Sequence, residues 1–251
     1  WCANAFLDRK GTIQSVMYMA AYDGCSLSNK LRSLSGAAPA ASQTFGAFRT
    51  LANANGNGYE QREFEKNQFV ASLLPMLFKG VDGQALVGKG ATSASAAISA
   101  GTMNDKPLFW GDQTGTAGVK FCGIENFWGN IYKWLDGIGL MSSNYGYKLY
   151  APYNDSMSGY TNSGVSVPTT GYIDTMSAAN GYGLAPKTTV STEASSKFHD
   201  YSYQINSSDP LVVVGGYWSS GALAGPFGWS GHSASYSNAY IGASLSFTPQ
   251  S

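Results

Sequence analysis

The sequence predicts an α+β protein in which one or two helices and several strands are joined by much irregular loop structure. Residues 59–80 place most of their apolar side chains on one face of a 3.6-residue period, as an amphipathic helix does. Residues 211–214 form a continuous apolar run, and residues 241–247 alternate apolar with small side chains, as strands do. The chain has 31 glycines and 16 tyrosines but only 12% charged residues. This composition indicates loops held by aromatic packing.

The length and the charge of the chain limit the classes of function that are possible. A chain of 251 residues can bury a sizeable core, as one large or two small domains. Its 15 basic residues balance 15 acidic ones without forming a basic stripe, so nucleic-acid binding is disfavoured. The longest apolar runs are far too short to span a bilayer, and we expect no membrane insertion. We find no signal peptide at the start. Because numbering begins at Trp1, we expect an excised domain.

Along the chain, residues 1–57 predict loops with short elements, forming an N-terminal segment that packs on or leads into a domain spanning 58–251. Within the helix predicted at 59–80, Pro75 removes one backbone hydrogen bond, so a kink or an early end is expected, and Gly80 is a plausible stop. Residues 83–100 are rich in Gly, Ala and Ser and predict a loop, and residues 108–121 are dense in turns. No fixed-period repeat is visible.

The stretch 123–139 leaves helix and strand open. Its apolar residues fit a helical period, but four glycines argue against a continuous helix, and 131–135 fits a strand equally well. Residues 140–190 hold many Tyr, Asn, Ser and Gly and predict edge strands with exposed loops.

Catalytic patterns are weak. Residues 83–89 match the first seven positions of the phosphate loop G-x-x-x-x-G-K, but Gly90 lacks the hydroxyl that the eighth position needs, which favours a Gly-rich connector. The sequence has two histidines, His199 and His232. Ser230 and His232 are close neighbours in a GWSGH stretch that lacks the G-x-S-x-G spacing, so a triad there is sterically awkward. We expect no enzyme activity and interpret His232 as a contact residue in a loop.

Metal ligands and disulfides are similarly unsupported. No Cys or His pair has zinc spacing, and Asp and Glu are sparse for calcium, so we expect no metal and no cofactor. Cys2, Cys25 and Cys122 are an odd number. A Cys2–Cys25 disulfide is possible, and three free buried thiols are the preferred interpretation.

Aromatic residues divide by their neighbours. Trp128, Trp134 and Trp218 lie beside glycines within apolar runs, which favours core packing. Trp229 and Tyr236 lie among Ser, Gly and His without an apolar period, so we predict that both are exposed. The whole segment 215–240 has the composition of an antibody combining site, with aromatic contact area and small adaptable polar groups. It predicts a display loop on a rigid base.

Two motifs resemble a known family. Residues 215–227, GGYWSSGALAGPF, resemble the G-G-x-W-x-x-G-x-x-A-G-x-F signature of variable proteins of diversity-generating retroelements, and the continuation to 241–243 resembles the family's closing motif. Residues 123–134, GIENFWGNIYKW, are similar to the G-x-E-N-x-W-G-N-x-W-x-W element of phage tail-fibre and receptor-binding proteins. Those proteins have a C-type-lectin-like fold of the formylglycine-generating-enzyme type.

The resemblance implies a compact C-type-lectin-like domain with an antiparallel sheet whose last strands display a ligand-binding face. Carried over by position, the scaffold residues are Gly215, Gly216, Trp218, Gly221, Gly225 and Phe227, with Trp128 and Trp134 from the upstream motif. The positions between them imply ligand contacts at Tyr217, Ser219, Ser220, Leu223, Pro226, Gly228, Trp229, Ser230 and His232, with Tyr236 added.

The sequence departs from the family at several points. Ser244 stands where the family has Arg, so we expect a buried polar anchor to be replaced or lost. No cysteine follows Cys122, so the cysteine pair of the enzyme relatives is absent and catalysis of that type is excluded. The lectin-type calcium motifs E-P-N, Q-P-D and W-N-D are also absent, so calcium-dependent sugar binding is not supported.

The expected function is receptor binding at the tip of a phage tail fibre in the virion. The partner is a bacterial surface receptor, either protein or glycan, and display as a homotrimer would raise a modest single-site affinity by avidity. A bacterial cell-surface or pilus-tip adhesin with the same fold, located outside the cell, is the alternative. A purely structural fibre module and an enzyme are the remaining ones.

Overall fold

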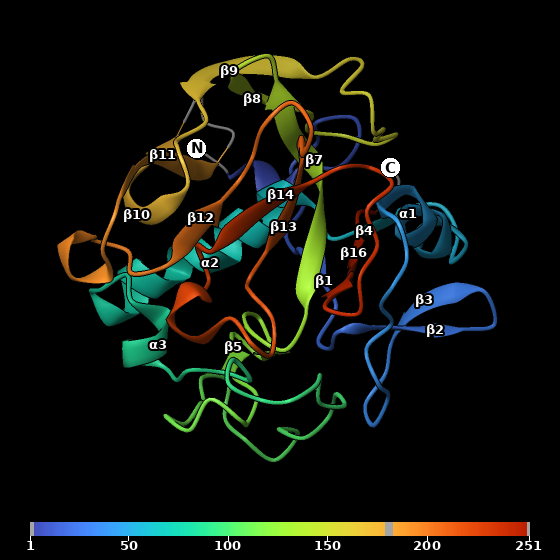
Figure 1. The fold of residues 1–251 in the computed structure, drawn as a ribbon. Helices are drawn as coiled ribbons and strands as arrows, with labels where there is room; N and C mark the ends of the chain where they lie inside the picture. Colours follow the sequence, from blue (N-terminus) through green and yellow to red (C-terminus); the bar gives the residue numbers. More distant parts are fainter. Residues whose placement is uncertain (1–2, 179–182, 250–251) are drawn as a thin grey trace.

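The computed structural model describes residues 3–178 and 183–249, and it has an α+β architecture in which strands predominate over helices (Figure 1). The predicted fold class is confirmed at this level. Within the described residues, no helix combines the length and the hydropathy required to cross a bilayer.

A nine-stranded sheet forms the centre, in the order β11-β10-β12-β14-β13-β7-β8-β9, with β15 also pairing with β7. Most neighbours are antiparallel, but β12 runs parallel to β14 and β15 runs parallel to β7, so the sheet is mixed rather than purely antiparallel. Its strands are β7 (Tyr132–Met141), β8 (Asn144–Tyr147), β9 (Thr161–Ser166), β10 (Gly171–Ala178), β11 (Leu184–Val190), β12 (Tyr201–Tyr203), β13 (Leu211–Val214), β14 (Trp229–His232) and β15 (Ile241–Gly242).

Smaller sheets surround it. One sheet joins both ends of the chain in the order β1 (Tyr18–Met19), β16 (Leu245–Phe247) and β4 (Tyr59–Gln61). Two hairpins pair β2 (Gly24–Leu27) with β3 (Lys30–Ser33), and β5 (Lys120–Phe121) with β6 (Ile124–Glu125). The alternating stretch 241–247 is therefore two short strands in two different sheets.

Three α-helices are present in the described chain rather than one or two: α1 (Phe45–Asn53), α2 (Phe64–Phe78) and α3 (Gly83–Leu86). Thr44 caps α1, its hydroxyl accepting from the Ala47 amide at 3.3 Å. The helix predicted over 59–80 begins later, because residues 59–61 pair with β16 as strand β4. Pro75 lies in the last turn of α2, and Lys79 ends the helix with a φ of 56°, one residue before the predicted Gly80.

The open choice at 123–139 resolves as two strands, β6 and β7, joined by a turn over residues 126–131. Both faces of the sheet are covered at β7 and β13. On one face, Trp134 and Val213 pack in a core with Phe45 of α1, and on the other, Leu135 and Val212 pack with Phe64 of α2. A strand buried on both faces reads as a continuous apolar run, which explains residues 211–214.

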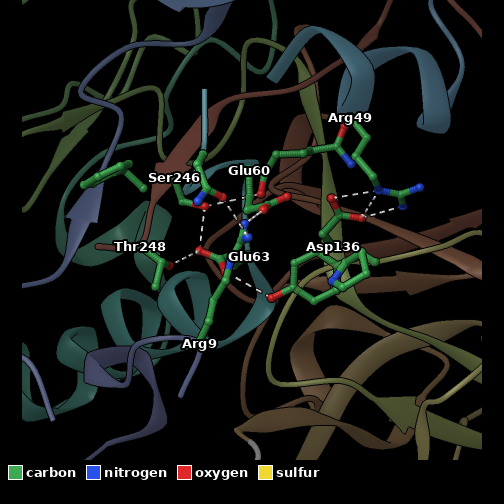
Figure 2. Close-up of polar contacts among 12 residues, drawn as sticks. Arg9, Arg49, Glu60, Glu63, Asp136, Ser246 and Thr248 are labelled. Atoms are coloured by element: carbon green, nitrogen blue, oxygen red, sulfur yellow. Dashed lines mark hydrogen bonds and ion pairs between the residues drawn. The ribbon is translucent and has the colours of Figure 1, made fainter. Parts of the chain in front are cut away.

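A buried polar network ties the last strand to α2 (Figure 2). Glu63 Oε2 accepts hydrogen bonds from the hydroxyls of Ser246 at 2.8 Å and Thr248 at 3.2 Å. Beside it, Asp136 of β7 pairs with Arg49 of α1, and burial raises the pKa of the Asp136 carboxyl to about 6. These contacts tie the C-terminal segment to the start of α2 and tie α1 to the central sheet.

Candidate ligand-binding surface

The turn between β6 and β7 is held by a buried charge network. The side-chain amides of Asn126 and Asn130 donate to Asp23 Oδ2 at 3.0 and 2.7 Å. Lys133 Nζ donates to the main-chain oxygens of Asn126 and Gly129 at 2.5 and 3.1 Å, and it lies 3.3 Å from Asp23 Oδ1. Burial lowers the pKa of Lys133 to about 8, against the opposing field of Asp23. The asparagines of the upstream motif are thus scaffold residues.

The upstream motif at 123–134 also holds the long loop that precedes it in sequence, through hydrogen bonds from that loop. The Glu125 carboxylate accepts from the main-chain amides of Gly101, Thr102 and Met103 at 2.8 to 3.3 Å. The Trp128 indole donates to the carbonyl of Gly88 at 3.1 Å. The segment 83–89, interpreted from the sequence as a Gly-rich connector, therefore supplies a short helix, α3, and a carbonyl that positions a core tryptophan.

The display loop predicted over 215–240 is interrupted by strand β14, and its first part, residues 215–228, leaves β13 through two glycines and is closed at its base. The Gly215 amide donates to the Gly228 carbonyl at 3.0 Å. Gly216 has a φ of +79°, and a Cβ there would lie 2.5 Å from Ala224 Cβ, so only glycine fits without displacement. The hydrogen bond between Gly215 and Gly228 joins the two ends of this loop and so restricts its conformation.

Other elements anchor the loop from outside. Gln84 of α3 donates its amide hydrogens to the carbonyls of Gly221 at 2.9 Å and Ala224 at 2.8 Å. Asp200 Oδ2 accepts from the Phe227 amide at 2.7 Å, and burial raises the pKa of Asp200 well above its ordinary value. A loop held at both ends and in the middle presents its side chains at little further entropic cost.

Six aromatic residues form what we call the aromatic cluster, and each is half-buried: Tyr132, Tyr217, Trp218, His232, Tyr236 and Tyr240. Tyr217 stacks on Tyr240 with ring centroids 4.6 Å apart, and His232 stacks on Tyr236 at 4.3 Å. The hydroxyls of Tyr236 and Tyr240 are hydrogen-bonded, which joins the two stacks. Tyr132 and Trp218 each approach the Tyr217–Tyr240 stack. The cluster joins the start of β7, the end of β14 and the loops beside them.

The cluster is uncharged at neutral pH. Burial lowers the pKa of His232 to about 4, because the imidazolium would lose its hydration there. The neutral ring lies edge-on to Trp134 at 6.1 Å, and its Nε2 is 3.4 Å from Ser230 Oγ. At pH 7 this surface therefore presents rings and hydroxyls without formal charge.

Half of the predicted ligand contacts lie at the surface. Tyr217, His232 and Tyr236 come together in the aromatic cluster, although Tyr236 is half-buried rather than fully exposed. Ser219 and Leu223 are exposed on the loop, with Leu223 at 39% of its full accessibility. Their contact with a ligand stays a prediction.

The other half are buried, and the predicted exposure of Trp229 is wrong. Trp229 is 1% exposed, and its ring packs against Phe64 and Tyr145 on the α2 side of the sheet. The reason is strand pairing, since β14 lies between β12 and β13 inside the sheet. The buried residues that we remove from the predicted contact surface are Ser220, Pro226, Gly228, Trp229 and Ser230.

Most of the predicted scaffold residues are buried. Trp128 and Trp134 are fully buried, which confirms their predicted core packing, and Phe227 is fully buried as well. Trp218 is the exception, because its ring is half-buried in the aromatic cluster while its main chain bonds to Asn130 and Ala94. Gly215, Gly216 and Gly225 are buried, and Gly221 is half-buried.

A buried arginine, Arg62, lies next to Ser244 in the core. Ser244 is buried, and its carbonyl accepts from the Arg62 amide at 2.8 Å. The Arg62 guanidinium lies over the Phe127 ring, 5.0 Å from its centroid, and donates to Asn67. Burial lowers the pKa of Arg62 to about 10.

Sequence reasoning missed Tyr132 and Tyr240. Tyr240 belongs to the same Ser- and Tyr-rich stretch as Tyr236, so extending the composition argument to the end of that stretch would have included it. Tyr132 has no such signal, because it lies among the buried residues of the upstream motif and only its place as the first residue of β7 leaves it half-buried.

Metal and thiol chemistry find no support in the part of the chain that the structure describes. No group of three or more His, Cys, Asp or Glu residues there is placed to hold a metal ion. Cys25 and Cys122 form no disulfide within the described residues, and burial raises the pKa of the Cys122 thiol to about 11. Cys2, and with it the possible Cys2–Cys25 bridge, lies outside the described residues.

Comparison with protein-family models and with curated proteins finds no match for this chain.

Proposed function

We propose that this chain is a receptor-binding protein whose aromatic cluster contacts a molecule on the bacterial surface. The observation that carries the proposal is the aromatic cluster itself, a group of half-buried rings with no formal charge at the edge of a firmly anchored loop. Tyrosine and tryptophan supply large contact area at low conformational cost, and the exposed Ser219 adds an adaptable hydrogen-bonding group.

The resemblance of the two motifs supports a C-type-lectin-like fold and a place at the tip of a phage tail fibre, as a variable protein of a diversity-generating retroelement. Display as a homotrimer would multiply the contribution of one modest surface. A bacterial cell-surface or pilus-tip adhesin would use the same surface, and the motifs are compatible with it.

The test is adsorption of the labelled full chain to a panel of whole bacterial cells. For any isolate that binds, we expect the double substitution Tyr217→Ala with Tyr240→Ala to weaken adsorption at least tenfold, because one ring stack is removed. The matched control is Met76→Ala, which truncates an apolar side chain that is 73% exposed on α2. Equal adsorption by the double variant and the control, with both folded, would refute the proposal.

A further inference from the structure

A groove of about 400 Å³ lies between the end of α1, the turn into β4 and residues 151–153. Its volume is within the range of small-molecule sites, roughly 300 to 1,000 Å³. Its lining includes Arg9, Asn53, Asn57, Tyr59 and Glu60. None of these residues belongs to the aromatic cluster.

The groove carries no net charge. Arg9 and Glu60 are its charged lining residues, and they form an ion pair with each other (Figure 2). Glu60 is buried, so the pair lies at the base. Because a charged ligand would have to compete with this pair, the groove favours a neutral, polar ligand.

Planar polar groups continue from the base to the rim. Arg9 donates to Asn57 Oδ1 at 3.3 Å. The Asn53 amide, oriented with its nitrogen toward acceptors, donates to Glu60 Oε2 at 3.0 Å and to the Tyr59 carbonyl at 2.9 Å. Asn53 and Asn57 are exposed, and each amide keeps donor or acceptor capacity toward the groove. Neighbouring amide, carboxylate and guanidinium groups match adjacent hydroxyls, each of which both donates and accepts.

An exposed aromatic row extends from the groove. Tyr18, Phe247 and Tyr59 lie opposite one another across β1, β16 and β4, and we call them the aromatic row. Phe247 lies 5.7 Å from Tyr18 and 4.8 Å from Tyr59, measured between ring centroids. Tyr18 is 47% exposed and Tyr59 is 37% exposed, and Tyr59 also lines the groove. The negative face of an aromatic ring attracts the polarised C–H groups of a sugar ring.

We propose that the groove and the aromatic row together bind a neutral oligosaccharide. One sugar places its hydroxyls against Asn53, Asn57 and the Arg9–Glu60 pair, and the next sugars lie over the aromatic row. A sugar is a neutral polyol with apolar ring faces. It therefore matches a neutral polar groove that lies next to exposed aromatic rings. The site uses no calcium, and it is independent of the proposed function because it shares no residue with the aromatic cluster.

The test uses the full chain with cellotetraose, chitotetraose and maltotetraose at millimolar concentration in the presence of EDTA. We expect saturation-transfer NMR to show binding of at least one of them. Asn57→Ala and Tyr59→Ala should each weaken that binding about tenfold by calorimetry. Tyr59→Phe keeps the ring and should retain binding, which separates stacking from a folding defect, and the Tyr217→Ala, Tyr240→Ala variant should bind as the parent does.

Four results would overturn the proposal. They are the absence of saturation transfer from all three sugars, binding that is unchanged in Asn57→Ala and Tyr59→Ala, binding that is lost instead with Tyr217→Ala and Tyr240→Ala, and a smaller oligomer by sedimentation for Tyr18→Ala and Tyr59→Ala. The third result would assign the sugar to the aromatic cluster, and the last would make the aromatic row a subunit interface. The result of the cell-adsorption test does not depend on the outcome of these sugar-binding experiments.

Discussion

The two ends of strand β14 make contrasting use of similar residues. Trp229 begins the strand and packs with Phe64 and Tyr145 beneath the sheet, whereas His232 ends it and stacks on Tyr236 in the aromatic cluster. The neighbours of both residues in sequence are Ser and Gly, so composition predicts the same exposure for both. The difference teaches that position along a strand, and the face to which each side chain points, decide between core and surface.

The largest effect that tests this contrast is on stability. Trp229→Ala should lower the free energy of unfolding by about 3 to 5 kcal/mol, because a large cavity opens against α2. Tyr236→Ala should cost about 1 kcal/mol, the worth of one ring pair. Urea unfolding monitored by circular dichroism measures both. Similar losses of unfolding free energy for the two variants would show that Trp229 and Tyr236 contribute equally to stability, which would contradict the contrast.

The second test concerns the turn that supports the cluster. Asp23→Ala removes the anion beside buried Lys133, and leaving that charge unpaired should cost about 3 to 5 kcal/mol. The control is Asp174→Ala, which breaks a pair with Lys197, a side chain that is 67% exposed, and should cost less than about 1 kcal/mol. Equilibrium unfolding compares them, and a small effect at Asp23 would contradict a structural role for the motif.

The third test uses pH. His232 should titrate near pH 4 by NMR, and substituting His199→Asn, whose side chain tolerates the φ of 63° at that position, leaves His232 as the histidine observed. Because its folded pKa lies below the ordinary value of about 6.5, the unfolded chain binds more protons between about pH 4 and 6.5. The stability that depends on His232 therefore rises with pH through that window and falls as the solution is acidified.

His232→Gln isolates this dependence, because Asp136 acts in the opposite direction. The raised pKa of Asp136 makes the folded chain bind more protons between about pH 4 and 6, so its contribution falls as pH rises. The difference between the parent and His232→Gln cancels that term. A difference that does not change with pH would show that His232 remains hydrated.

The smallest effect is expected on the exposed part of the loop. Ser219→Ala should change the free energy of unfolding by less than about 0.5 kcal/mol, because its side chain is exposed. If adsorption to a susceptible isolate falls in the same variant, the loop acts in binding rather than in folding. Thermal unfolding and cell adsorption are measured on the same preparation, and a loss of stability would place Ser219 with the scaffold.

Part of the fold and of the candidate surface could be predicted from local pattern. The helix α2, the apolar run at β13 and the buried Trp128 and Trp134 follow from periodicity and neighbours. The predicted apolar face of α2 is only partly right, because Lys66 is buried and Leu77 is 55% exposed. The extra helix α3, the strand at residues 59–61 and the parallel pair of β12 with β14 did not follow. The two strand pairings depend on partners that are remote in sequence, whereas α3 has a local signal in Asp82, whose side chain accepts from the Ala85 amide at 2.9 Å.

The sequence by itself determined the kinds of residue available for binding: aromatic and small polar side chains, balanced charge, and glycines where the loop turns. Only the tertiary structure decided which of them face outward. Trp229 is fully buried and Tyr132 is only half-buried because sheet order and strand ends, rather than local composition, decide how far each side chain is covered. The physical reason is that a strand's two faces are equivalent until other elements cover them.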